Sequence, residues 1–322
     1  MSIKIISPGL LTTVQDLGRF GYMESGFSPC GVMDSFSARL ANILVDNSER
    51  DGVLEMTMIG VTAVFDEDNI IAVTGAEFAP KINGVEVPMN SAVRINAGDV
   101  LECGSAITGC RGYLAVAGGF DIAPVMGSMS TNLKCGIGGF NGRKLSVGDI
   151  IPLRHSQDRL YGMSSRSLEL KFDLQQVKTI HVIFGPQDNY FSQSGKDTFC
   201  SEIYKVTAQS DRMGIKLDGA SVEAIDGVDI ISDGIALGSV QIPSSGKPII
   251  MMADRQTTGG YAKIATVITA DIPVLAQMRP GDSLKFKKVD LNYARNRIKE
   301  NERILKKLKD DIIRTDTILR YV

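Results

Sequence analysis

Histidine is scarce in this chain of 322 residues, which contains only His155 and His181. Two histidines leave little material for a Ser-His-Asp or Cys-His catalytic centre, so proton transfer would fall to carboxylates, lysines or tyrosines. The five cysteines are odd in number and show no C-x-x-C spacing, which argues against a zinc site and favours reduced, mostly buried thiols. We therefore expect no bound metal.

Long apolar runs and an excess of one charge are also missing. No run approaches the roughly 18 residues of a membrane-spanning helix, and the formal net charge is -2. Neither a membrane protein nor a nucleic-acid-binding protein is therefore indicated. Residues 1–6 lead directly into a strand-like pattern rather than a targeting segment, so we expect a cytoplasmic protein.

Glycine, in contrast, is abundant and spread over the whole chain, with 33 residues. Short apolar segments bounded by Gly, Asn or Asp predict short strands and tight turns, and hence a mainly β fold. A Gly-Asp pair stands before apolar residues at 97–101, 147–151 and 280–284, which is typical of a turn that leads into a strand. The predicted strands are residues 61–65, 70–74, 85–88, 92–95, 100–103, 112–116, 177–184, 204–207, 230–232, 239–242, 249–252 and 264–269.

Two segments have helical periodicity. Apolar residues fall on one face of residues 35–45, and Asp34 stands at the N-cap position of this predicted helix. Asp34 is therefore compatible with capping as well as with a functional site. Residues 292–319 repeat apolar side chains at three- and four-residue intervals among many charges, which predicts a C-terminal packing or assembly helix.

A polar, Ser-rich stretch over residues 154–176 separates two halves of the chain. We expect one domain over residues 1–155, a second over 175–288, and the C-terminal helix over 289–322. In the first half, residues 118–143 form a glycine-rich polar segment longer than an ordinary connection, which makes it a candidate for function. The segment lacks the Lys-Ser/Thr ending of a phosphate-binding loop, so it does not predict a nucleotide site.

The most informative stretch is residues 241–261. An apolar run over residues 249–252 leads into the polar residues 254–258, and the Gly259-Gly260 pair then permits a tight turn or a close backbone approach. A hairpin with a polar tip would account for this pattern. Residues 8–22 contain the same ingredients near the N-terminus, so a pair of related polar sites is the competing interpretation.

Taken in order, these motifs resemble the family of the C subunit of 5-oxoprolinase. This family is also called allophanate hydrolase subunit 2 or the Kip inhibitor antagonist, and it includes half of the carboxyltransferase domain of urea carboxylase. The resemblance covers about residues 3–287. It is carried by Pro8-Gly9, Gln15-Asp16, Gly18-Arg19, Gly21-Tyr22, Gly31, Met33-Asp34, Ala41-Asn42, Leu54-Glu55, Gly118-Gly119, Gly142-Arg143, Ser210 to Gly214, Gln241, Pro243, Asp254 and Gln256 to Tyr261.

The resemblance implies two tandem cyclophilin-like β-barrels with few short helices and a C-terminal helix. It also implies a partner, the B-type subunit or Kip inhibitor homologue, and an ATP-using A-type subunit. The implied reactions are ATP-dependent opening of 5-oxoproline to glutamate, or carboxyl transfer from carboxybiotin to a urea-like nitrogen. Carboxybiotin or ATP would come through partner subunits, with no cofactor bound tightly by this chain. The alternative is a non-catalytic regulatory protein that binds and antagonises a kinase-inhibitor homologue.

Chemistry at an amide-like nitrogen needs a carboxylate to accept a proton and donors to stabilise the oxygen that gains charge. We assign the catalytic role to Asp254, Asp211 and Asp16. Guanidinium groups can hold a carboxylate bidentately, and amide and hydroxyl groups can bind an amide or ureido group at both edges. The predicted substrate-binding residues are Gln15, Arg19, Asp34, Arg143, Arg212, Gln241, Gln256, Thr257, Thr258 and Tyr261.

These assignments have structural alternatives. Asp211 and Arg212 also suit a structural ion pair at a turn. Residues 15–19 also suit a network that braces a loop, and Tyr261 also suits packing beside its neighbouring glycines.

Two positions depart from the family pattern. Relatives usually carry arginine at the position of Met129 and serine at the position of Cys30. Methionine cannot replace a guanidinium that clamps an anion. We therefore expect a different substrate or a reduced activity compared with the better-known members of the family.

Overall fold

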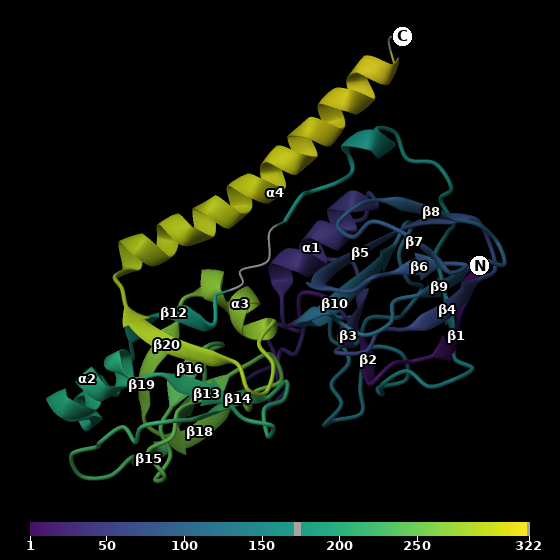
Figure 1. The fold of residues 1–322 in the computed structure, drawn as a ribbon. Coiled ribbons are helices and arrows are strands. Elements are labelled where there is room, and N and C mark those ends of the chain that lie inside the picture. The colour runs from purple at the N-terminus through teal and green to yellow at the C-terminus, as the bar shows by residue number, and fades with distance from the viewer. Residues whose placement is uncertain (171–174, 321–322) are drawn as a thin grey trace. The chain divides into compact units, whose positions relative to one another are not determined.

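The computed structural model describes residues 1–170 and 175–320. The chain forms two compact units, each built mainly from strands (Figure 1). Residues 20–29 belong to a different unit from the residues on either side of them, and the C-terminal helix contributes to both units. The first unit comprises Met1–Arg19, Cys30–Phe172 and Asn301–Val322, and the second comprises Phe20–Pro29 and Asp173–Glu300.

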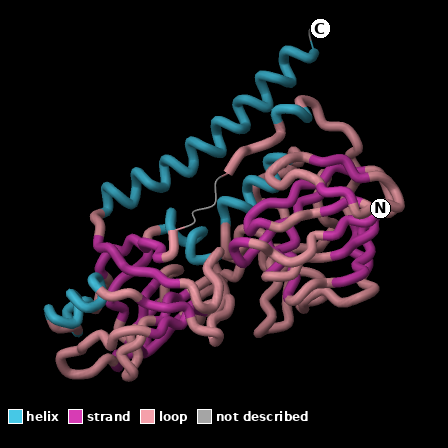
Figure 2. Tube along the Cα trace, viewed as in Figure 1, coloured by secondary structure: helices cyan, strands magenta, loops and turns pink. Residues whose placement is uncertain are grey.

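The first unit contains two antiparallel sheets (Figure 2). One sheet has six strands in the order β11-β1-β4-β9-β6-β7, and the other has five strands in the order β2-β3-β10-β5-β8. The bounds are β1 Ser2–Ser7, β2 Leu11–Gln15, β3 Val53–Thr57, β4 Thr62–Phe65, β5 Asn69–Glu77, β6 Lys81–Ile82, β7 Val85–Glu86, β8 Val93–Ile95, β9 Val100–Glu102, β10 Thr108–Val116 and β11 Ile150–Pro152.

Two hydrophobic clusters stabilise the first unit. One contains side chains of both sheets, such as Ile3 of β1 and Leu54 of β3, and so lies between the sheets. Val53 precedes Leu54 on the same strand and therefore points to the opposite face, where the second cluster includes Leu40 and Leu308. Helices α1 (Ser35–Leu44) and α4 (Leu291–Arg320) supply these last two residues, so both helices cover the outer face of the five-stranded sheet.

The second unit contains a closed barrel of seven strands in the order β12-β19-β16-β17-β14-β13-β20. The barrel closes through parallel pairing of β12 with β20. A separate two-stranded sheet joins β15 to β18. The bounds are β12 Val177–Phe184, α2 Gln193–Ser201, β13 Tyr204–Val206, β14 Gly214–Asp218, β15 Asp229–Gly234, β16 Ser239–Gln241, β17 Ile249–Met251, β18 Thr258–Tyr261, β19 Lys263–Val267, α3 Ile272–Ala276 and β20 Ser283–Lys288; short 3-10 helices span Met163–Ser165, Asp188–Tyr190 and Thr269–Asp271.

The mainly β fold predicted from the sequence is confirmed. The predicted strand over residues 177–184 coincides with β12, and the helix predicted over residues 35–45 begins one residue after its predicted cap, Asp34. The three Gly-Asp turns directly precede β9, β11 and β20. The C-terminal helix packs through Leu305, Leu308 and Ile312 against the cluster that contains α1, as a packing element would.

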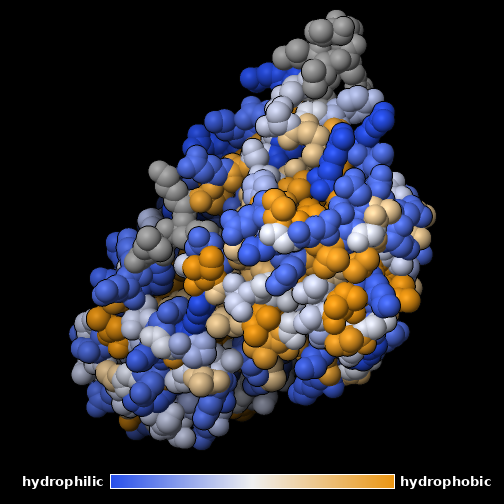
Figure 3. All heavy atoms as spheres, turned by 45° about the vertical axis from the view of Figure 1, so that its right-hand side comes forward, coloured by the Kyte–Doolittle hydropathy of each residue, from blue (hydrophilic) through white to orange (hydrophobic). Residues whose placement is uncertain are grey.

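The surface carries hydrophobic side chains in several separate groups among polar ones on the face drawn in Figure 3. The described part of the chain contains no helix with the length and apolar character needed to span a membrane. None of the five cysteines forms a disulfide in the described part of the chain; Cys30, Cys103 and Cys110 are buried and Cys135 is exposed.

Candidate functional site

Asp16 forms the centre of a polar cluster in the first unit. The residue follows β2 and is 7% exposed. Its Oδ1 accepts hydrogen bonds from the backbone N–H of Gly18 at 2.9 Å and from the hydroxyl groups of Ser128 and Ser130. Its Oδ2 accepts from the backbone N–H of Met129 at 2.7 Å. One carboxylate thus fixes the loop formed by residues 128–130 against the end of β2.

Gln15 and Arg19 bind the same loop from either side of Asp16. The Gln15 amide donates from Nε2 to the Thr131 carbonyl at 3.1 Å. The Arg19 guanidinium donates from Nε to the Val125 carbonyl at 3.0 Å and from Nη2 to the Ser130 carbonyl at 2.9 Å. Both side chains are fully buried. Backbone carbonyls of residues 125–131 hold both side chains in place, and the described hydrogen bonds include none between Gln15 and Arg19.

One atom of each of these two side chains has no hydrogen-bond partner among the described residues. These atoms are Oε1 of Gln15, an acceptor, and Nη1 of Arg19, a donor. A buried polar atom without a partner costs about 1–3 kcal/mol. The cluster therefore contains an unused acceptor and an unused donor, the complement of an amide group, but both atoms are buried away from solvent.

Two glycines allow the second part of the polar loop to pack closely on this cluster. Gly138 and Gly139 have φ angles of 69° and 53°, in the left-handed region. A Cβ atom on Gly138 would collide with the Ser130 carbonyl and lie 2.6 Å from Nη2 of Arg19, and one on Gly139 would collide with the Thr131 hydroxyl. The long glycine-rich segment thus folds back on itself beside the buried arginine.

The sequence indicated this loop as a whole but not the residues within it that bind Asp16. Ser128 and Ser130 were missed because a serine beside a glycine is common in ordinary turns. The alternation Ser-Met-Ser-Thr was the available signal, since it places both hydroxyl groups on one side of an extended segment. The Met129 side chain packs against the hydrophobic cluster between the sheets. It therefore contributes apolar contact, and not an anion-binding group, at this position.

Asp34 and Arg143, two predicted substrate-binding residues of the first unit, are occupied by local interactions. Asp34 caps α1, because its Oδ1 accepts from the backbone N–H of Ser37 at 2.9 Å and its Oδ2 from the Ser37 hydroxyl at 2.7 Å. Arg143 donates to both carboxylate oxygens of Asp149, at 2.7 and 2.8 Å. This contact holds the pKa of Asp149 below its ordinary value. Neither side chain joins the cluster around Asp16 in the described hydrogen bonds.

In the second unit, Arg212 and Asp254 form a bidentate ion pair. The guanidinium donates from Nε and Nη2 to the two carboxylate oxygens at 2.9 and 2.8 Å. The Arg212 side chain is 6% exposed and the Asp254 side chain 15% exposed, so the carboxylate is reachable from solvent at one edge. Asp211 is exposed, and its Oδ1 accepts from the backbone N–H groups of Met213 and Gly214. The arginine therefore pairs with the distant Asp254, and its neighbour Asp211 braces the turn.

Gln241 lies buried at the end of β16, beside β18. Its Nε2 donates to the carbonyl of Tyr261 at 3.4 Å. A Cβ atom on Gly259 would lie 2.8 Å from Nε2 of Gln241, 2.7 Å from the Ile235 side chain and 3.2 Å from Nε2 of Gln256. The first glycine of the Gly-Gly pair is thus needed for close approach, which brings two amide side chains to one point of the backbone.

The other residues of this stretch lie nearer the surface. Gln256 and Thr258 are exposed, Thr257 is half-buried, and the Tyr261 side chain is 39% exposed. They flank or form β18, which pairs with β15. Their side chains are therefore placed to contact a ligand or a protein at the surface rather than to fill the barrel interior.

Beside this stretch lies a buried lysine that was not predicted from the sequence. Lys263 follows β18, is 3% exposed, and donates from Nζ to Oδ2 of Asp233 at 2.9 Å. Gln187 donates to the same oxygen at 3.2 Å. The Lys263 contact, with smaller help from Gln187, keeps the pKa of Asp233 below its ordinary value. The available signal for a buried lysine was a single charge at the start of an otherwise apolar strand. It was missed because such a charge commonly marks an exposed strand end.

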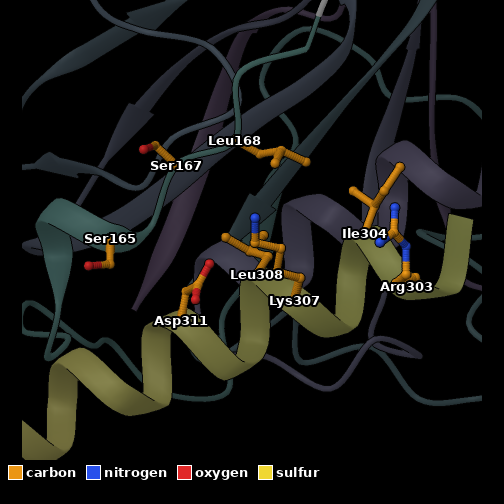
Figure 4. Close-up of a pocket in the computed structure, with 8 residues that line it drawn as sticks. All are labelled: Ser165, Ser167, Leu168, Arg303, Ile304, Lys307, Leu308 and Asp311. Atoms are coloured by element: carbon orange, nitrogen blue, oxygen red, sulfur yellow. The ribbon is translucent and has the colours of Figure 1, made fainter. Parts of the chain in front are cut away.

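A pocket of about 520 Å³ in the first unit contains none of the predicted site residues (Figure 4). Three polar residues of α4 and two serines surround a partly apolar floor in this pocket. Within the described residues, no group of three or more His, Cys, Asp or Glu side chains is arranged to hold a metal ion. The pocket is lined by Ser165, Ser167, Leu168, Arg303, Ile304, Lys307, Leu308 and Asp311.

Comparison with known proteins identifies the relatives of this chain. It is 38% identical over 312 residues to the 5-oxoprolinase C subunit of Escherichia coli (strain K12), which covers 95% of this chain and 97% of the relative. It is 31% identical to the urea amidolyase of Lachancea kluyveri, over 98% of this chain but 18% of that protein. The solved structure of the K. lactis urea amidolyase matches with a TM-score of 0.88 and 28% identity, over 95% of this chain and 20% of the larger chain.

The predicted resemblance to the C subunit of 5-oxoprolinase is confirmed by these matches. The family described as "Carboxyltransferase domain, subdomain A and B" matches residues 25–288, which include the polar stretch 241–261. The N-terminal motif over residues 8–22 lies outside the matched residues. The chain belongs to this carboxyltransferase-domain family.

Proposed function

We propose that this chain is the C-type subunit of a 5-oxoprolinase complex that uses ATP to hydrolyse 5-oxoproline to glutamate. The observation that carries this proposal is the extent of the match to the 5-oxoprolinase C subunit, 95% of this chain and 97% of the relative. The urea amidolyase match covers only 18% of that relative. A protein that matches a single subunit from end to end suits a complex in which B-type and A-type subunits are separate chains.

The polar groups of the cluster in the second unit suit a cyclic amide that carries a carboxylate. The Arg212 guanidinium fixes the Asp254 carboxylate, which keeps one edge towards solvent. We assign to Asp254 the acceptance of a proton from the attacking water, and that proton can then pass to the ring nitrogen as the C–N bond breaks. Gln241, Gln256, Thr257 and Thr258 are assigned to bind the amide edges.

The two other predicted catalytic carboxylates are assigned supporting roles. All four described hydrogen bonds to the Asp16 carboxylate come from its own loop and the loop around residue 129. Asp16 is therefore assigned to fix the loop whose carbonyls accept from Gln15 and Arg19. Asp211 braces the turn that holds Arg212. Substrate binding remains our assignment for Gln15, Arg19, Arg212 and Tyr261, whereas Asp34 is assigned to cap α1 and Arg143 to pair with Asp149.

The test is reconstitution with an A-type and a B-type subunit of 5-oxoprolinase, followed by measurement of 5-oxoproline turnover with ATP. Asp254→Asn keeps the shape of the side chain but cannot accept a proton in the same way, and we expect kcat to fall by about 100- to 10,000-fold. Asp121→Asn, a change of an exposed carboxylate in the first unit, is the matched control and should leave kcat unchanged. An Asp254→Asn complex that assembles and keeps its kcat would contradict the assignment.

Carboxyl transfer is the second candidate, favoured by the TM-score of 0.88 to the K. lactis urea amidolyase. Carboxybiotin would then arrive on a partner subunit, and the same Asp254 would accept the proton of a urea-like nitrogen. Supplying carboxybiotin and urea to the assembled complex separates the two reactions. The absence of turnover with either set of substrates would favour the regulatory alternative, in which the chain binds a kinase-inhibitor homologue without chemistry.

A further inference from the structure

The strand β15 carries a prominently exposed apolar side chain. Ile231, in the middle of this strand, is 95% exposed. Among the described residues, β15 pairs with β18 alone, with a register shift between Asp229 and Asp233 where Ile231 stands, and no strand pairs with its outer edge. An open edge with an exposed apolar side chain is a template for pairing with another extended segment.

The segment around β15 is strongly acidic. Residues 217–246 contain no Lys, Arg or His. Lys263 neutralises Asp233, but no ion pair holds Asp226 or Asp229 in the part of the chain that the structure describes. Both carboxylates are exposed. The five acidic residues of the segment are Asp218, Glu223, Asp226, Asp229 and Asp233.

These charges decide which strand can pair with this edge. A second copy of β15 would bring carboxylates opposite carboxylates, and like charges across neighbouring strands are destabilising. An extended segment with lysine or arginine side chains would find complementary charge at Asp226 and Asp229, which precede Ile231. The edge is therefore closed to self-association and open to a basic strand.

We propose that β15 is a docking edge for an extended segment of a different protein chain, in which basic side chains alternate with apolar ones. Backbone hydrogen bonds would add the segment to the β15–β18 sheet, Ile231 would contact an apolar side chain, and Asp226 and Asp229 would pair with the basic residues. This inference goes beyond the proposed function, because it concerns assembly and does not depend on which reaction the complex performs.

The position of this edge links docking to the candidate site. Neighbouring strands lie about 4.8 Å apart, and β18 on the other side of β15 carries Thr258 and Tyr261. A docked segment would therefore lie two strand spacings from these residues. Lys263 and Gln187 tie β15 to the barrel through Asp233, which gives the edge a fixed support.

The probe for this proposal is a fluorescent peptide of about nine residues that alternates lysine with valine, titrated into the full-length protein at low salt. We expect saturable binding that weakens with added salt. A peptide alternating glutamate with valine should not bind. A lysine–valine peptide N-methylated at every second residue keeps its charges but loses the donors along one edge, and it should not bind either.

Variants of the protein locate the binding edge. Ile231→Asp and the double variant Asp226→Lys/Asp229→Lys should each weaken binding by about tenfold or more. Because these side chains are exposed, we expect the fold to be retained, as judged by the thermal midpoint. Val85→Asp is the matched control, since Val85 is 69% exposed on β7, an outer strand of the six-stranded sheet.

Four outcomes would overturn the proposal. These are no saturable binding of the lysine–valine peptide, equal binding of its N-methylated form, an unchanged dissociation constant for Ile231→Asp, and equal weakening by Val85→Asp. Self-association that Ile231→Asp abolishes would replace the proposed partner by a second copy. All of these experiments measure peptide binding and none measures catalysis. A negative result in the activity assay would therefore count against the proposed function and not against the docking edge.

Discussion

At the scale of single residues, the carboxylate of Asp16 is the most heavily used side chain of the candidate site. We predict that Asp16→Asn destabilises the protein by about 1–3 kcal/mol. In one orientation the new amide N–H₂ faces the backbone N–H of Gly18, and in the other it faces that of Met129, so a donor meets a donor either way. Urea unfolding, followed by circular dichroism, measures the change.

Asp211→Asn is the matched control for this prediction. The described hydrogen bonds to Asp211 reach only its Oδ1, from Met213 and Gly214. Asparagine can keep its oxygen there and turn its N–H₂ group to solvent. The expected loss is about 0.5 kcal/mol or less, as for most exposed substitutions. Equal losses for the two variants would show that the four-bond arrangement at Asp16 adds nothing.

At the scale of elements, one turn is used three times to start a strand. In each copy the aspartate carboxylate accepts the backbone N–H of the residue three positions earlier, at 2.8, 2.7 and 2.8 Å. The glycine before each aspartate has a φ angle of 86°, 85° or 100°. A positive φ at the third position is typical of a type II turn, which favours proline at the second position. The third copy has Pro280 there.

Val147 occupies the position of Pro280 in the second copy, where it is 72% exposed. We predict that Val147→Pro stabilises the protein by about 0.4–1 kcal/mol, because proline restricts the unfolded chain in a conformation that the turn already adopts. Ala97→Pro, at the same position of the first copy, is the contrasting variant. The Ala97 backbone N–H donates to Asp68, so proline removes a hydrogen bond there. A lower thermal midpoint for Val147→Pro would contradict the type II assignment, and midpoints that rise equally in both variants would show that the Ala97–Asp68 hydrogen bond adds no stability.

The part of α4 that includes Glu302 and Lys309 is attached to Arg39 of α1 and to Glu49 by charges that depend on pH. Arg39 donates to both carboxylate oxygens of Glu302, and this contact lowers the pKa of Glu302. Burial raises the pKa of Glu49, but the contacts from Lys309 and Arg39 outweigh burial and lower it overall. Both glutamates have folded-state pKa values below their ordinary value of 4.5. Their ionised forms therefore stabilise the folded protein fully above pH 4.5, and this stabilisation is lost as the pH falls through the folded-state pKa values.

We therefore predict that the amide protection of residues 302–315 is constant from neutral pH down to about 4.5 and then falls with the pH. Hydrogen exchange, corrected for the intrinsic pH dependence of exchange, measures this. In Arg39→Met the protection should be lower at neutral pH and respond less to acid. The prediction would be wrong if the amide protection of the unaltered protein were the same above and below pH 4.5.

The parts of the site that the sequence predicted are those with local causes. Asp34 and Ser37 are three residues apart, and each Gly-Asp turn is complete within four residues. The hydrogen bonds of the cap and of the turns can therefore be predicted from neighbouring residues in the sequence. The partner of Arg212 could not be read in this way. It stands 42 residues along the chain, and its adjacent carboxylate, Asp211, was the more obvious candidate. Pairing at such distances is decided by the strand order of the barrel.

At the scale of the whole molecule, the chain passes between its two units several times. Residues 1–172 lack α4, whose Leu305, Leu308 and Ile312 complete the cluster on α1. Burial of each such side chain is worth about 1.5–3 kcal/mol. Residues 173–322 lack residues 20–29, whose Ser28 donates to the Ala253 carbonyl. Each of these two fragments is thus missing part of a compact unit.

We predict that the fragments 1–172 and 173–322 are poorly folded when expressed separately and recover a cooperative thermal transition when they are coexpressed. A peptide of residues 301–322, added to the first fragment, should raise its thermal midpoint, whereas the same peptide with Leu308→Asp should not. A first fragment that melts at the midpoint of the intact protein without any addition would contradict the prediction.

The same chain path has an evolutionary consequence. The chain crosses from one unit to the other between residues 19 and 20, 29 and 30, 172 and 173, and 300 and 301. A single recombination event within the gene therefore cannot replace one unit and leave the other intact. Each unit must be inherited with the other, and adaptation to a new acceptor substrate has to proceed by point substitutions within both rather than by shuffling of halves.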